Sequence, residues 1–328
     1  MIKRGLNPKL SEIGKIKMGY KGKEVISKKG NKFRPPKKLD YFVITTTERD
    51  VNKNLIQDKF IMDRIKEVTN QDKIRELRIR LPFDSVDKNF FTQFQFYSGR
   101  KKICSGDGII AEWRAMQNGK VVLPFYDEMK EVQAVQGQVY NIKCDPEECE
   151  FSKAGKCKVS GILSAFLPDA RDLGGVYKFR THSYNSVSSI LAALEYFKEQ
   201  TGGILQGMPL KFVMVKKTTE EHGTIDYCTV VIDGVEVAGL RRAALEEKNN
   251  RKLLGADIAA YELKQENAGF FKDTDPEDVV NAEYYPETVE IEEKRDKGTS
   301  PEELTSKLDE PKQEEEKTEP KQDKEELF

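Results

Sequence analysis

The stretch Glu76-Leu-Arg-Ile-Arg-Leu81 has the cleanest strand pattern in the sequence, because its charged and apolar residues alternate. Successive side chains of a β-strand point to opposite faces, so this period of two predicts a strand with one buried face. Other β-branched and aromatic runs, separated by Gly, Pro or charged residues, predict further strands on both sides of it. They are Tyr41–Thr45, Phe94–Tyr97, Val121–Tyr126, Val139–Lys143, Ile162–Phe166, Val176–Arg180, Leu210–Val215 and Tyr227–Ile232.

Helical spacing of apolar residues occurs in three places between these runs, over 52–70, 186–201 and 240–265. The second of these ends at Gly202-Gly203, and we expect Ser183 or Ser186 to be its N-cap rather than a nucleophile. Runs of strands with single helices between them are typical of α+β proteins. The sequence therefore predicts an α+β fold with a β-rich body of mixed or antiparallel sheets.

The composition is too polar for one compact domain, with 34% charged and 38% hydrophobic residues among 328. Residues 1–39 hold thirteen Lys or Arg against two Glu, whereas 287–328 hold sixteen acids against eight bases. We therefore expect a basic flexible arm (1–38), a globular body (39–270) and an acidic, mostly disordered tail (271–328). With neither a long apolar span nor a secretory signal, a cytoplasmic protein without a membrane partner is expected.

Cysteine spacing predicts a metal site in a loop over 140–160. An odd total of five cysteines disfavours a disulfide framework. Cys144, Cys149 and Cys157 lie close together in the sequence, and a tetrahedral Zn²⁺ ion would gather such thiolates. Cys104 is the first choice for the fourth ligand because it lies where a strand runs into a tight turn, and His182 and Cys228 are the alternatives.

We expect this zinc to be structural, because four cysteines would close its coordination sphere. The chain has only two histidines and contains neither an HExxH motif nor a Gly-rich phosphate-binding frame. The sequence therefore predicts no catalytic residue, no small-molecule substrate and no enzymatic activity.

The segment from Arg80 to Gly239 resembles the recombination directionality factors of temperate phages. The shared features include the cysteine loop and a distinctive Thr-x-Ser-x-Asn-Ser segment. The matching stretches are Arg80-Leu-Pro-Phe83 leading into Phe94–Tyr97, Cys104-Ser-Gly-Asp-Gly108, Cys144-x4-Cys149-x7-Cys157, Gly161-Ile-Leu163, Val176-Tyr177, Thr181-His-Ser-Tyr-Asn-Ser186 and Gly203-Ile204 with Gly207-Met-Pro-Leu210. Members of that family often carry Thr or Ser where this chain has His182, which favours Cys104 as the fourth ligand.

The resemblance implies an accessory factor that is not an enzyme. Such a factor would bind a large serine integrase on attachment-site DNA in the bacterial host cell and promote prophage excision between attL and attR. The helix expected over 240–265 is one candidate for the integrase contact, although it could instead simply cover the sheet. The basic residues that edge its apolar stripe are Arg241, Arg242, Lys248, Arg251 and Lys252.

Two other functions remain open on the sequence alone. A zinc-containing protein that binds single-stranded or nonspecific DNA would use the basic arm for weak phosphate contacts. A metal-dependent phage hydrolase would need an open metal position, for which the sequence offers little support.

Overall fold

The computed structural model describes residues 10–255 and 288–289, apart from 22–24, 27–29, 31, 34, 52–54, 99–100, 126–127, 171–174, 220–222 and 235. The chain divides into two units, Met1–Glu290 and Ile291–Phe328, and every described residue belongs to the first unit. Of the predicted acidic tail, only 288–289 lie within the described residues.

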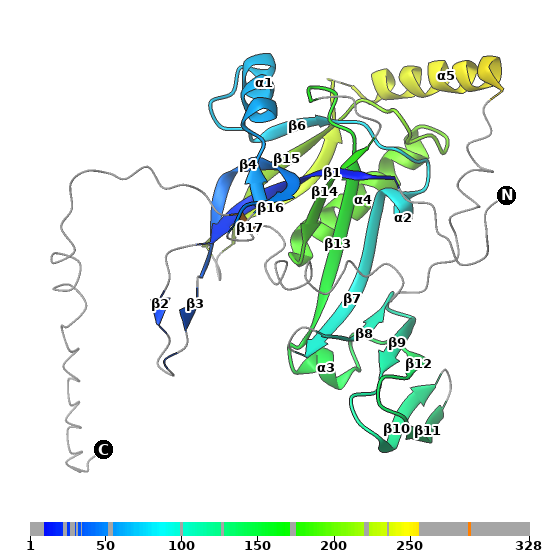
Figure 1. The fold of residues 1–328 in the computed structure, drawn as a ribbon. Coiled ribbons are helices and arrows are strands. Elements are labelled where there is room, and N and C mark those ends of the chain that lie inside the picture. Colours follow the sequence, from blue (N-terminus) through cyan, green and yellow to red (C-terminus); the bar gives the residue numbers. More distant parts are fainter. Residues whose placement is uncertain are drawn as a thin grey trace, which may run out of the picture. The chain divides into compact units, whose positions relative to one another are not determined.

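A ten-stranded mixed sheet forms the frame of the first unit (Figure 1). Nine strands follow one path, along which only β1 and β14 are parallel neighbours. The tenth strand, β17 (Thr288–Val289), also pairs in parallel with β1. The nine are, in spatial order, β12 (Val139–Lys143), β9 (Ile110–Arg114), β8 (Lys101–Gly106), β7 (Phe90–Ser98), β13 (Cys157–Ala165), β14 (Val176–Thr181), β1 (Glu12–Lys21), β4 (Pro36–Arg49) and β5 (Leu55–Gln57).

A second, antiparallel sheet contains β16 (Gly223–Ile232), β15 (Leu210–Thr219) and β6 (Glu76–Ile79). Leu77 and Ile79 of β6 are buried, which confirms the strand predicted from their alternation with charged residues. Phe212 of β15 links the two sheets: its ring stacks on Phe42 of β4 at 5.0 Å and lies 4.8 Å from the ring of Phe179 of β14. The main hydrophobic core lies at this contact.

Helix α4 (Tyr184–Gln200) packs against β16 and begins two residues before the predicted start, directly after Ser183, one of the two predicted N-caps. The Ser183 hydroxyl accepts a hydrogen bond from the backbone N–H of Ser186 and is the N-cap. Ser186 is buried, and its hydroxyl accepts the backbone N–H of Cys228 at 3.0 Å, which ties the helix to β16. Among the described residues, no helix is both long and apolar enough to cross a membrane.

The remaining elements are short or peripheral. The other helices are α1 (Lys59–Thr69), α2 (Val86–Asn89), α3 (Glu150–Lys153) and α5 (Val237–Leu254). Two further hairpins are formed by β2 (Val25–Ile26) with β3 (Lys32–Phe33) and by β10 (Gly119–Phe125) with β11 (Glu128–Ala134).

Two predicted helices differ from the structure at their ends. The helix predicted over 52–70 begins only at Lys59, because the Asp58 side chain caps it by accepting the Ile61 N–H at 3.0 Å, and Leu55–Gln57 belongs to β5. The helix predicted over 240–265 ends at Gly255, whose φ of 62° lies in the left-handed region that favours glycine. Residues 256–265 lie outside the described residues.

The predicted flexible arm over 1–38 is wrong for the part that forms β1. Ile16 and Met18 of β1 are buried in the core, and alternate with Lys15 and Lys17 on the other side of the strand. Lysines at the alternate positions made this strand look like a solvated basic segment in the sequence, because buried lysines are rare. Gly14 is required for the close packing, since a Cβ there would lie 2.6 Å from the Tyr177 ring.

Glu12 neutralises part of the positive charge beside β1. Its carboxylate receives two hydrogen bonds from Arg180, at 3.1 and 2.9 Å, and lies 3.4 Å from the Nζ atoms of both Lys15 and Lys178. Burial raises the pKa of Glu12, but the hydrogen bonds and charge of Arg180, with Lys15 and Lys178, outweigh burial and lower the pKa to about 2. The ionised carboxylate therefore stabilises the folded state.

We predict that Glu12→Gln destabilises the protein at pH 7 by roughly 3 kcal/mol, the free energy that corresponds to the difference in pKa. In the unsubstituted protein this stabilisation is complete above the ordinary pKa of 4.5, and is lost as the pH falls towards about 2. Urea unfolding as a function of pH measures it, with Glu246→Gln on the exposed face of α5 as the control. A constant difference between the Glu12 variant and the unsubstituted protein from pH 7 to pH 3 would contradict the assignment.

Candidate functional site

Four of the five cysteines lie in or at the end of a region that we call the cysteine lobe, residues 101–157, which contains β8–β12 and α3. Figure 1 shows these elements together at one end of the large sheet, away from β15, β16 and α4. A small hydrophobic cluster joins the lobe to β7. Its buried members are Phe96, Ile103, Trp113, Ala115, Leu123 and Ala134.

Strand pairing places two cysteines on either side of one aromatic residue. Cys104 of β8 lies opposite Phe96 of β7, and Phe96 in turn lies opposite Cys157 of β13. Directly opposed residues of neighbouring strands project from the same face of a sheet. Cys104 and Cys157 therefore share a face, and both pack against the cluster that contains Phe96.

The other two cysteines belong to the loop between β12 and β13. The backbone N–H of Cys144 donates to the carbonyl of Ile109 at 2.8 Å, which anchors the loop to the turn before β9. Cys149 occupies the N-cap position of α3, and Phe151 in that helix stacks on Phe96 with the ring centroids 4.7 Å apart. This stack brings the loop to the face that carries Cys104 and Cys157.

All four thiols are free and partly buried. Burial, followed by the charges of Cys144, Cys157 and Cys149, raises the pKa of Cys104 to about 12. Burial and the charges of Cys149 and Cys144 raise the pKa of Cys157 to about 11. Four such thiols gathered together suit a soft cation, which would stabilise their thiolate forms.

As the side chains are placed, no group of three or more His, Cys, Asp or Glu residues within the described part of the chain is arranged to hold a metal ion. The zinc ion thus stays a prediction. Cys104 lies close enough to Cys144, Cys149 and Cys157 for their charges to raise its pKa, and its role as fourth ligand stays a prediction as well.

The two alternatives for the fourth ligand have other surroundings. The Nδ1 atom of His182 lies 3.0 Å from the carbonyl oxygen of Val159. Cys228 is fully buried in β16, where its thiol donates to the sulfur of Met18 at 3.5 Å. Cys228 is therefore a core residue of the second sheet.

Helix α5 lies at the periphery of the fold in Figure 1. Leu240 and Ala244 are its buried residues. Four of the five basic residues predicted to contact a partner are exposed, and three leucines are exposed beside them. The exposed residues are Arg241, Arg242, Leu245, Lys248, Lys252, Leu253 and Leu254.

Arg251, the fifth of these basic residues, is engaged inside the molecule and is not part of the exposed face. Its guanidinium forms an ion pair with Asp84, bonds to Glu247 at 3.0 Å and bonds to Gln206 at 3.0 Å. Burial raises the pKa of Asp84, but the hydrogen bonds from Arg251 and from the backbone N–H groups of Gln206 and Leu205 lower it overall. Arg251 therefore fixes the end of α5 to the loop before α2.

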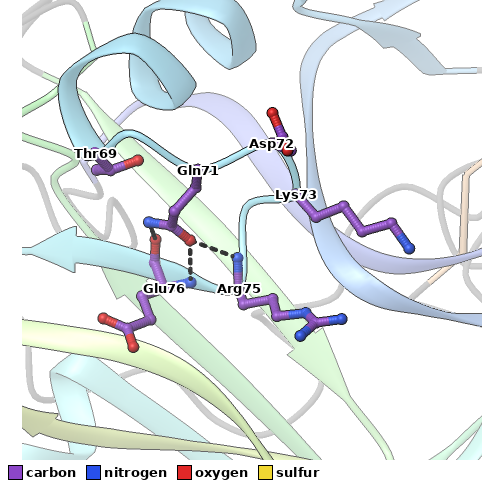
Figure 2. A pocket seen from close by; sticks show the side chains of 6 residues that line it. All are labelled: Thr69, Gln71, Asp72, Lys73, Arg75 and Glu76. Carbon is purple, nitrogen blue, oxygen red and sulfur yellow. Dashed lines mark hydrogen bonds between the residues drawn. The ribbon is translucent and has the colours of Figure 1, made fainter.

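A shallow surface depression lies between α1 and β6 and is shown in Figure 2. Its central side chain is Gln71, whose carbonyl oxygen accepts the N–H groups of Arg75 at 2.9 Å and Glu76 at 3.3 Å. The amide of Gln71 also donates to the carbonyl of Glu76 at 3.4 Å. These bonds close the turn between helix and strand, so Gln71 has a structural role.

The chain matches the family model described as Gp3-like, recombination directionality factor-like, over residues 13–238. It belongs to this family. Neither a curated protein nor a solved structure matches the chain. The match confirms the resemblance seen in the sequence and extends it towards the N-terminus, through β1 and β4.

The matched residues of this member of the directionality factor family include α4, the whole cysteine lobe, the second sheet and the large sheet apart from Glu12 and β17. They end at Ala238, the second residue of α5. The exposed basic face of α5 thus lies beyond the family match, whereas all four clustered cysteines lie within it.

We predict that Arg251→Gln loosens α5 and lowers the free energy of unfolding by about 2 kcal/mol, because a hydrogen bond to a charged group contributes about that much. The neighbouring Lys252→Gln is a matched control, since Lys252 is exposed. Urea unfolding gives the stability of each variant, and limited proteolysis followed by mass spectrometry locates the loosened segment. Equal midpoints and equal cleavage within α5 for the two variants would contradict the role of Arg251.

Proposed function

We propose that this protein is a directionality factor that binds a large serine integrase on attachment-site DNA and switches it from integration to prophage excision, the recombination of attL with attR. The observation that supports this most is the family match across 13–238. A ligand can redirect an enzyme only through its different affinities for two of the enzyme's arrangements. Such a factor requires a defined binding surface rather than an active site.

The role described for the family is regulatory, and we propose that the chain has no catalytic activity of its own. The crowded serines at the start of α4 support this proposal through their contacts. Ser183 caps the helix and Ser186 binds the backbone of β16, so both hydroxyls have structural partners.

We further propose that the exposed face of α5 contributes to the contact with the integrase. Lys248 and Lys252 are one helical turn apart, and Leu245 lies on the preceding turn of the same side. A basic edge beside exposed leucines is suited to packing against an acidic amphipathic helix. Because the family match ends at Ala238, this contact would be a feature of the chain outside the shared part.

The second candidate function is binding of single-stranded or nonspecific DNA through the basic N-terminal segment. The burial of Lys15 and Lys17 argues against it, because their side chains lie within the fold as part of β1. Phosphate contacts require accessible cations. The N-terminal residues 1–9 are outside the described part of the chain, so the experiment below also tests direct DNA binding.

We predict that the protein retards the integrase complex on attL and attR further in a native gel, and does not retard the same DNA alone at physiological salt. In a recombination assay the protein should increase the amount of excision product, formed from attL and attR. It should decrease the amount of integration product, formed from the phage site attP and the bacterial site attB. Retardation of DNA without integrase, weakened steeply by added salt, would support nonspecific DNA binding instead. An unchanged ratio of the two products would contradict the switch.

We predict that the double variant Lys248→Glu/Lys252→Glu binds the integrase roughly ten-fold more weakly, because each reversed surface charge costs up to about 1 kcal/mol and adds repulsion. The variant Lys59→Glu/Arg64→Glu on the exposed face of α1 is the matched control. Titration of labelled integrase at two salt concentrations measures both affinities. Wild-type affinity in the α5 variant would exclude α5 from the interface, and a loss in the control would place the interface at α1.

A further inference from the structure

We propose that Cys104, Cys144, Cys149 and Cys157 bind one Zn²⁺ ion, which fastens the cysteine lobe to the β7–β13 pair. The four ligands come from four different places: the middle of β8, the residue after β12, the N-cap of α3 and the first residue of β13. A single ion would therefore join segments that are otherwise held by strand pairing and by the small cluster around Phe96.

The arrangement of the thiols favours one metal centre over two disulfides. Cys104 and Cys157 lie on the two strands that flank β7 and so are not directly opposed to each other, whereas Cys144 and Cys149 belong to the loop beside the same face. None of the four forms a disulfide, and the fifth cysteine lies apart in β16. Four thiolates match the number of ligands that Zn²⁺ prefers in a structural site, where it is tetrahedral with bonds of about 2.3 Å.

Closing the site requires the four side chains to turn towards a common centre, since they are not arranged around one as placed. The loop that carries Cys144 and Cys149 is positioned for this by two contacts. The Cys144 N–H bonds to Ile109, and Phe151 stacks on Phe96 between the strand positions of Cys104 and Cys157.

The turn between β8 and β9 depends on a glycine. Gly108 has a φ of 101°, a conformation that other residues rarely adopt. The next residue, Ile109, accepts the N–H of Cys144, so this turn also fixes where the cysteine loop begins.

The hydrophobic cluster of the lobe is small, so a bound metal ion would add substantially to its stability. Its cluster contains only six buried side chains, two of them alanine. Small cores of this kind are commonly stabilised by a structural metal ion or by disulfides. We therefore expect the metal to stabilise residues 101–157 locally, with little effect on the core around Phe212.

The test measures metal content on the full-length protein by elemental analysis after expression with zinc. We expect about one zinc per chain in the unsubstituted protein and in Cys228→Ala, and less than a tenth of that in each of Cys104→Ser, Cys144→Ser, Cys149→Ser and Cys157→Ser. Absence of zinc from the unsubstituted protein would overturn the proposal. Full retention by Cys104→Ser would overturn the assignment of the fourth ligand.

A second measurement remains informative if a variant fails to fold. Replacing the metal by Co²⁺ in the unsubstituted protein should give the intense visible absorption of a tetrahedral site with four thiolates, and a weaker, shifted spectrum would show that fewer sulfur atoms bind. Hydrogen exchange before and after chelation should show faster exchange in 101–157 and unchanged exchange in α4, β15 and β16. Uniformly faster exchange, or no change in the lobe, would contradict the local role of the ion.

Discussion

The ion pairs between Glu12, Arg180 and their neighbouring lysines hold β1 between β14 and β4, and the rest of the large sheet depends on this position. Along the sheet, β4 and β5 reach the other strands only through β1. Phe42 of β4 in turn supplies the ring that stacks on Phe212 of the second sheet. Without β1, the two sheets would lose the surface on which the main core forms.

How far the sequence predicts the fold depends on whether a local pattern is visible. The run Val139–Lys143 predicts β12 with both ends correct, and the alternation that starts at Glu76 predicts β6 with its first residue correct. The apolar spacing after Ser183 predicts α4. β1 was missed because lysines occupy its other face and resemble a solvated basic arm. A buried lysine in a sheet can be recognised from the sequence only when its acidic partner is known. For Lys15 that partner is Glu12, which is itself held in place by Arg180 on β14.

In the candidate site, too, the sequence predicts neighbours that are close along the chain but not those that strand pairing brings together. Spacing alone groups Cys144, Cys149 and Cys157, whereas the place of Cys104 depends on its pairing opposite Phe96. Arg251 was grouped with the exposed basic residues of α5 because its partner Asp84 is 167 positions away in the sequence. The shared frame of the family ends where α5 begins, so a recombinase contact through α5 would distinguish this chain from relatives that share only the frame.

The parallel pairing of β1 with β14 has a consequence for how the chain acquires its structure. Glu12 and Arg180 are 168 residues apart, so the ribosome must add that many residues after Glu12 before β1 can meet this neighbour. Contacts between such distant residues form slowly because a large loop must close first. During synthesis, therefore, the edge of β1 that will pair with β14 stays unpaired until residues 176–181 have been made. Pairing of β14 with β1 then joins the two halves of the large sheet.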